Sequence, residues 1–180
     1  MDTHKPDILI GATGAPATFT REIVEKMASI KSRPGIFALS NPTSRAECTA
    51  EEAYTWTDGR AIFASGSPFD DVVINGKIHR AGQGNNSYIF PGVGLGMISC
   101  QGKTIPESVF LTAARALAES VGEDDLEVGS IYPQIDEIRE VSLNIASAVA
   151  AHAWDIGVTD APRPDDITAH IADSMYDPSY

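Results

Sequence analysis

Three short runs of apolar residues in the first part of the chain, residues 1–70, predict buried strands. The runs cover residues 8–10, 36–39 and 62–64, and each is continuous, as in strands of a parallel sheet that are covered on both faces. Helical spacing of apolar positions predicts helices between them. We therefore predict an α/β protein whose β-α-β-α-β unit is the C-terminal half of a Rossmann-like, doubly wound parallel sheet, followed by C-terminal helices.

Residues 71–90 show a different pattern, which predicts a hairpin followed by a polar loop. Asn75-Gly76 lies between two β-prone runs, and this dipeptide favours a type I′ turn. The adjacent amides Asn85 and Asn86 follow in a glycine-rich segment. These two side chains could orient a polar ligand at a helix N-terminus or form an Asx turn, and the sequence leaves both interpretations open.

Residues 91–180 are predicted to be mainly helical. The longest helix is expected over residues 136–156, with Gly157 as its stop and a further short helix from Asp166. An acidic connection is expected between Gly122 and Gly129. We expect residues 1–180 to form a single, truncated domain with these three parts.

Two segments have the spacing of a capping box, in which a threonine hydroxyl and a glutamate three residues later satisfy backbone groups at a helix start. Thr49 and Glu52 predict one helix start, and Thr104 and Glu107 predict a second.

Composition narrows the possible partners. The 180 residues are 43% hydrophobic. Because 25 residues are acidic and 13 are basic, the formal net charge is −12. This negative charge argues against nucleic acid or an anionic membrane as the main partner. No apolar run has the length of a membrane span. Cys48 and Cys100 lie far apart without a CxxC motif, so we expect a reducing compartment and a cytoplasmic protein.

Each predicted strand runs into small or polar residues at its carboxyl end: 11–14, 40–43 and 65–68. Ligands of open parallel sheets bind outside this edge, and glycine lets a ligand approach the backbone. The same residue types also dominate ordinary βα loops. Three loops at one edge nevertheless favour a binding site.

Motifs for catalysis or metal binding are missing from the sequence. Residues 11–14 are not a GxGxxG fingerprint, and the glycines of 92–96 are better explained by helix packing. His152 falls on an apolar helix face, so we expect a hydrogen-bonded core or subunit-contact histidine. We predict no catalytic residue and no metal ligand in this chain.

Longer motifs carry a family resemblance. They are Ile36-Phe-Ala-Leu-Ser-Asn-Pro-Thr-Ser44 with Ala46-Glu-Cys-Thr49, Ala61-Ile-Phe-Ala-Ser-Gly-Ser-Pro-Phe69, and Gly82-Gln-Gly-Asn-Asn86 before Pro91-Gly-Val93. In order and spacing they closely resemble the malic enzyme family. The resemblance implies oxidation of malate with NAD or NADP, decarboxylation to pyruvate and CO₂ with Mg²⁺ or Mn²⁺, and a homo-oligomer.

The resemblance also implies roles for individual residues, carried over by position. The implied substrate-binding residues are Asn41, Asn85 and Asn86. The implied NAD(P)-binding residues are Ala12, Thr13, Asn41, Gly66 and Asn86.

The family's tyrosine acid, lysine base, three metal-binding carboxylates and glycine fingerprint have no match in this sequence. We therefore expect the chain alone to be an inactive fragment of the NAD(P)-binding domain. The alternative is a non-catalytic module that binds a nucleotide or a partner chain.

Overall fold

The three predicted strands form a parallel sheet in the computed structural model, which describes residues 1 and 3–176. They are β1 (Ile8–Gly11), β2 (Gly35–Ala38) and β3 (Ile62–Ser65), and they lie in the sheet in sequence order. A fourth parallel strand, β6 (Gly82–Gln83), pairs with β3. The sequence did not predict β6, because its two small or polar residues carry no apolar pattern.

The chain divides into two compact units. The first comprises Met1–Asn85 and Gly122–Tyr132, and the second comprises Asn86–Val121 and the residues from Pro133 onward. The end of the predicted tail, 177–180, lies outside the described residues.

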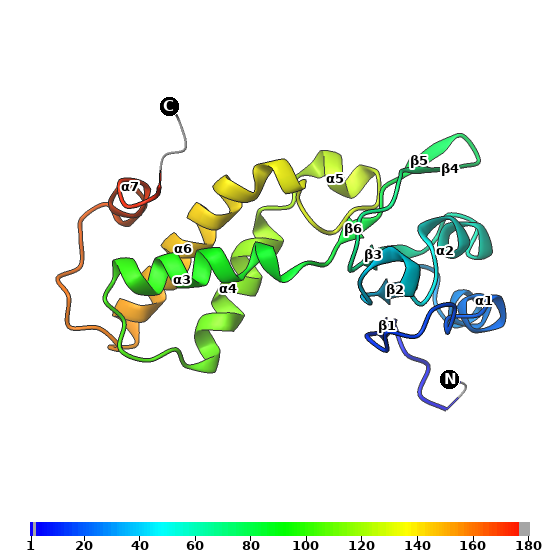
Figure 1. Cartoon of the computed structure of the whole chain (residues 1–180), viewed down its shortest axis with the longest axis horizontal. Helices are drawn as coiled ribbons and strands as arrows, with labels where there is room; N and C mark the ends of the chain where they lie inside the picture. Colours follow the sequence, from blue (N-terminus) through cyan, green and yellow to red (C-terminus); the bar gives the residue numbers. More distant parts are fainter. Residues whose placement is uncertain (2, 177–180) are drawn as a thin grey trace. The chain divides into compact units, whose positions relative to one another are not determined.

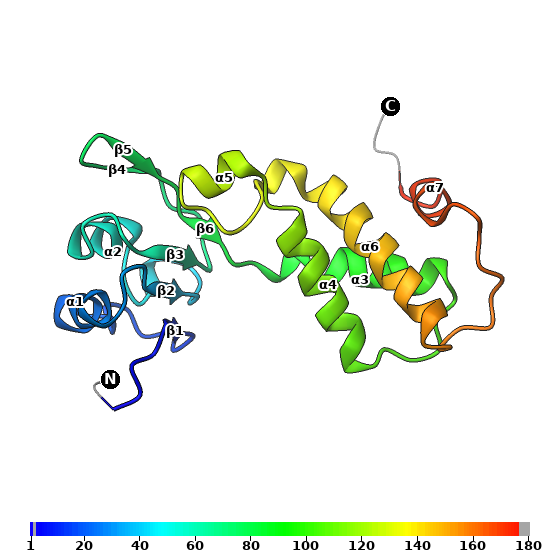
Figure 2. The ribbon, with the colours of Figure 1, turned by 180° about the vertical axis from the view of Figure 1, so that it is seen from behind.

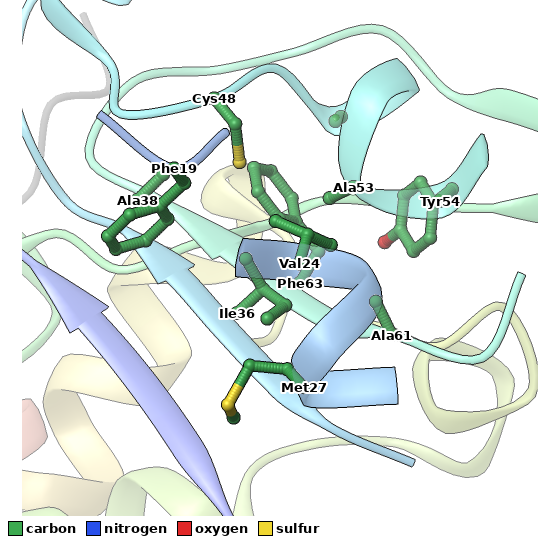
Figure 3. Close-up of a cluster of buried hydrophobic side chains, with 11 residues drawn as sticks. Phe19, Val24, Met27, Ile36, Ala38, Cys48, Ala53, Tyr54, Ala61 and Phe63 are labelled. Carbon is green, nitrogen blue, oxygen red and sulfur yellow. The ribbon is translucent and has the colours of Figure 1, made fainter. Parts of the chain in front are cut away.

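Two helices, α1 (Arg21–Ile30) and α2 (Ala50–Trp56), lie side by side against the sheet of the first unit (Figure 1). Between them and the strands lies a core of buried side chains, shown in Figure 3. Val24 contributes from α1, Tyr54 from α2 and Phe63 from β3. Burial of such side chains contributes about 1.5–3 kcal/mol each, and it fixes the helices on the sheet.

The local turn and cap predicted for this unit are confirmed. Thr49 and Glu52 form the capping box of α2, since the Thr49 hydroxyl accepts from the Glu52 amide at 3.1 Å and the Thr49 amide donates to the Glu52 carboxylate at 2.8 Å. The hairpin joins β4 (Val72–Ile74) to β5 (Lys77–His79). Asn75 and Gly76 have φ of 53° and 77°, as a type I′ turn requires.

The second unit is helical, as predicted. It contains η2 (Asn86–Tyr88), α3 (Phe90–Ser99), α4 (Glu107–Glu119), η3 (Ile135–Glu137), α6 (Ile138–Asp155) and α7 (Ile167–Ala172). Figure 2 shows α3, α4 and α6 next to one another, in agreement with their contacts.

Glycines on α3 allow its close approach to α6. A Cβ at Gly92 would lie 2.6 Å from the Ile145 side chain, and a Cβ at Gly96 would lie 2.6 Å from the carbonyl oxygen of Ala146. The helix-packing interpretation of the glycines in 92–96 is therefore confirmed for these two.

The second predicted capping box is wrong. The N-cap of α4 is Pro106 with extended backbone angles, and it makes no side-chain capping bond. The residue before a proline avoids the helical region, so Ile105 cannot belong to a first turn capped by Thr104.

The predicted acidic connection also differs, because it contains the short helix α5 (Glu123–Glu127). The other helix ends agree: Gly157 has φ of 70° after α6, and Asp166 accepts from the Ala169 amide at 2.9 Å at the start of α7. No described helix has the length and apolar character needed to cross a membrane.

Candidate functional site

Backbone hydrogen bonds bring the three polar loops together at the carboxyl edge of the sheet. The Leu39 amide donates to the Gly11 carbonyl at 2.9 Å, and the Gly66 amide donates to the Ala38 carbonyl at 3.1 Å. Both bonds continue the parallel register past the ends of the strands. We call residues 12–14, 40–41 and 65–67 the rim.

Glu47 lies beneath the rim and joins two of its loops. It lies two residues after the short helix η1 (Thr43–Arg45), and its side chain is fully buried. Glu47 Oε1 accepts from the Thr13 amide at 2.9 Å, from the Thr13 hydroxyl at 3.0 Å and from the Ser40 hydroxyl. Glu47 Oε2 accepts from the Ser40 amide at 3.3 Å. A single carboxylate thus fixes the loops after β1 and β2.

The protonation state of Glu47 follows from this environment. Burial raises the pKa of the Glu47 carboxyl, but the hydrogen bonds from the Ser40 hydroxyl and from the Thr13, Glu47 and Ser40 amides together lower it by more, so the net pKa is below its ordinary value. Glu47 is therefore ionised at neutral pH and acts only as an acceptor. The sequence did not predict a role for Glu47; the available signal was an acidic residue between the small apolar residues Ala46 and Cys48.

Asn41 is exposed on the rim, and its amide has a defined orientation. Its Oδ1 accepts from the buried Ser67 hydroxyl at 2.7 Å, while its Nδ2 makes a long bond of 3.4 Å to the Gly66 carbonyl. An amide NH₂ carries two hydrogens, so one remains for the oxygen of a ligand. This donor suits a carboxylate or carboxamide oxygen.

Gly66 allows two loops to come into contact. A Cβ there would overlap the carbonyl oxygen of Leu39 and lie 2.8 Å from its carbonyl carbon. The amide of Gly66 donates to Ala38, and its carbonyl accepts from Asn41. These contacts explain a glycine at this position without reference to a ligand.

The other predicted site residues are placed as follows. Ala12 and Thr13 are exposed on the rim, but the Thr13 amide already donates to Glu47. Asn85 follows β6 in the first unit. Asn86 is exposed and is the first residue of η2 in the second unit. The rest of η2 and Ile89 therefore separate it from the start of α3. Asn41 and Gly66 are thus in direct contact, while Asn86 belongs to the other unit.

Groups with other possible chemistry are accounted for by structural contacts. His152 Nε2 lies 2.8 Å from the Ser108 hydroxyl, as expected of a hydrogen-bonded histidine. The His79 ring lies against Tyr54 with ring centres 4.9 Å apart, and burial followed by the charge of Lys77 lowers the pKa of His79. Among the residues that the structure describes, no group of three or more His, Cys, Asp or Glu side chains could hold a metal ion.

The sequence matches a known family over most of its length. Residues 1–154 match the sequence model described as "Malic enzyme, NAD binding domain". The chain belongs to the malic enzyme family. The resemblance drawn from the motifs is therefore confirmed, and the rim lies within the matched residues of this malic enzyme domain.

Individual relatives support the same assignment. The chain is 51% identical to the "NADP-dependent malic enzyme, chloroplastic" of Oryza sativa subsp. japonica, over 100% of this chain and 28% of that protein. It is 52% identical to the "NADP-dependent malic enzyme" of Phaseolus vulgaris, over 98% and 30% respectively. The chain thus spans less than a third of the length of these malic enzymes.

Solved structures confirm the predicted fold class. The malic enzyme of Pyrococcus horikoshii Ot3 aligns with a TM-score of 0.69 and 27% identity, over 93% of this chain and 34% of that one. The malic enzyme of Entamoeba histolytica aligns with a TM-score of 0.71 and 25% identity, over 94% and 31%. The parallel sheet with its helices is consistent with a Rossmann-like NAD-binding domain.

Proposed function

We propose that this chain supplies the NAD(P)-binding part of a malic enzyme that oxidises malate and decarboxylates the product to pyruvate and CO₂. The observation that carries the proposal is the exposed, oriented amide of Asn41 on a rim of three loops, in a chain whose residues 1–154 match the malic enzyme NAD-binding domain. Ligands of parallel α/β sheets bind at this edge.

Asn41 is proposed to bind at the meeting point of substrate and cofactor. The Ser67 hydroxyl orients the amide through Oδ1, so the free hydrogen on Nδ2 would donate to a carboxylate of malate or to the carboxamide of the nicotinamide. Asn85 and Asn86 are proposed as further substrate contacts, with Asn86 also reaching the cofactor.

Ala12, Thr13 and Gly66 are proposed to contact the dinucleotide through their backbone. The Thr13 amide is engaged by Glu47, so a contact at Thr13 would use its carbonyl oxygen. Gly14 has φ of 67°, and a Cβ there would meet nothing within 4 Å, which leaves open space over this loop for a ligand. The rim therefore fits a flat dinucleotide that approaches the backbone closely.

Relatives of this chain in rice and bean are named NADP-dependent, so NADP is the cofactor to test first and NAD the second. When bound, the nicotinamide would accept the hydride from malate. The resemblance also implies Mg²⁺ or Mn²⁺, for which we propose no ligand among the described residues.

The experiment uses the complete protein that the gene encodes. Calorimetry with NADP⁺ and NAD⁺ should show binding of at least one, and malate with Mn²⁺ should yield NADPH or NADH. Asn41→Ala should weaken both activities, whereas Asn144→Ala, at an exposed position of α6, should change neither. Absence of both binding and turnover in the complete protein would overturn the proposal, and binding without turnover would favour a non-catalytic module.

Residues 1–180, expressed alone, are proposed to be inactive, because none of them matches the acid, base or metal ligands of the family. Production of NADPH by residues 1–180 alone would refute this.

A homo-oligomer in a reducing compartment such as the cytoplasm is also proposed. Both cysteines are free and buried, as they would be in that compartment, although the rice relative is named chloroplastic.

A further inference from the structure

The buried carboxylate of Glu47 has no cation beside it in the described part of the chain. Among residues 1 and 3–176, none of the ion pairs includes Glu47, and its charge is balanced by hydrogen-bond donors, chiefly those of Thr13 and Ser40. A buried charge costs free energy that an apolar side chain of similar size would avoid. The hydrogen bonds that Glu47 accepts from the loops, rather than apolar packing in the core, therefore account for a carboxylate at this position.

These partners form a series of hydrogen bonds that holds the backbone of the loop after β1 in place. The Gly14 amide donates to the Ser40 hydroxyl oxygen at 2.8 Å, and the Ser40 hydroxyl in turn donates to Glu47. The Thr13 amide donates to Glu47 directly. Two successive amides of the loop are thus held by one carboxylate, directly and through one hydroxyl, and they point away from any ligand above the rim.

The same bonds set the loop after β2. Glu47 accepts both the amide and the hydroxyl of Ser40, the residue immediately before Asn41. The side chain of Glu47 also packs so closely on β1 that a Cβ at Gly11 would lie 2.6 Å from its Cγ. Any shift of Glu47 would therefore move the start of one rim loop and the backbone that carries Asn41.

We propose that Glu47 is a positioning residue for dinucleotide binding, whose buried carboxylate holds the backbone at Thr13–Gly14 and Ser40 in the binding geometry without touching the ligand. This inference rests on the proposed function, since it assumes that the rim binds NAD(P). Its structural half, the restraint of the two loops, stands on the hydrogen bonds alone.

The test compares Glu47→Gln and Ser40→Ala with Glu52→Ala in the complete protein. Glu47→Gln keeps the size of the side chain but presents an NH₂ group to donors, and Ser40→Ala removes the hydroxyl that links Gly14 to Glu47. Glu52 lies on helix α2, where its side chain accepts from the Thr49 amide in the capping box, so its loss should lower stability without removing a hydrogen bond of the rim. Two measurements are made: hydrogen exchange of the segment 11–14 without cofactor, and the dissociation constant for NADP⁺ or NAD⁺.

We expect Glu47→Gln and Ser40→Ala each to speed exchange of the segment 11–14 and to raise the dissociation constant about tenfold, the loss expected for hydrogen bonds to a charged group. Glu52→Ala should leave both values unchanged despite a lower melting temperature. If Glu47→Gln does not fold, Ser40→Ala carries the test. In the double variant, the dissociation constant should rise by less than the product of the two single increases, because both substitutions act on one hydrogen-bond network.

Two failures are distinguishable. Wild-type protein that binds cofactor, with variants that bind it equally well, would overturn the role of Glu47 and leave the proposed function intact. Wild-type protein that binds neither cofactor would overturn the proposed function itself. Slow exchange of 11–14 retained in both variants would overturn the restraint of the loop.

Discussion

Ser67 donates its hydroxyl to Oδ1 of Asn41 across 2.7 Å, and this bond joins the loop after β3 to the loop after β2. The Ser67 side chain is buried, and the Ser65 hydroxyl donates to its carbonyl at 2.7 Å. The bond fixes the orientation of the Asn41 amide: the oxygen faces Ser67, and one N–H hydrogen remains for a ligand.

Ser67→Ala should therefore weaken cofactor binding through Asn41. Without the hydroxyl, the amide can rotate between its two orientations, and loss of a neutral hydrogen bond costs about 1 kcal/mol, or roughly fivefold in the dissociation constant. Calorimetry with NADP⁺ measures the change. Ser147→Ala is the matched control, because its buried hydroxyl has no hydrogen-bond partner among the described residues. Equal affinity of wild type and Ser67→Ala would contradict the orienting role.

Three glycines on α3 provide a graded test of packing in the second unit. Gly92→Ala and Gly96→Ala should each lower the free energy of unfolding by about 1–3 kcal/mol, because the added methyl group meets α6 at 2.6 Å. Gly94 faces open space in the same helix, so Gly94→Ala should raise it by about 0.5–1 kcal/mol.

Urea denaturation of the three variants measures these differences. A Gly92→Ala variant as stable as Gly94→Ala would show that α3 and α6 do not approach as described.

Acid stability should depend on Glu47. Its pKa in the folded protein is below the ordinary value of 4.5, so its ionised form stabilises the fold at pH values above about 4.5. This stabilisation is lost as the pH falls through the depressed pKa of the folded state. The difference in melting temperature between wild type and Glu47→Gln should thus be largest at neutral pH and shrink in acid. A difference that grows as the pH falls would contradict the ionised state of Glu47.

The two thiols should be unreactive in the folded protein. Burial, with the charges of Glu52 and Glu47, raises the pKa of Cys48 to about 12, and burial also raises the pKa of Cys100. The thiolate is the reactive form, so at a pH of about 8 little of either thiol should react with a disulfide reagent. Denaturant should expose both. Rapid labelling of Cys48 in the native protein would contradict its burial.

Caps and turns could be predicted from the sequence where they depend only on residues close together along the chain. The capping box of Thr49 and the Asn75-Gly76 turn depend on residues close in sequence, and both are confirmed. Pro106 shows the limit of such motifs: the spacing of Thr104 and Glu107 was suitable, but the proline between them excluded the first turn. Strand β6 was missed because its pairing with β3, rather than its own residues, makes it a strand.

The sequence by itself determined the family, the parallel arrangement of three strands and the edge at which their polar loops end, because long motifs and apolar runs specify these directly. Tertiary structure alone decided what those loops can offer a ligand. Thr13 and Glu47 are 34 positions apart, yet the Thr13 amide donates to Glu47 and is therefore not available to a ligand. Hydrogen-bond partners distant along the chain are chosen by packing of the sheet and its helices, and no local pattern records that choice.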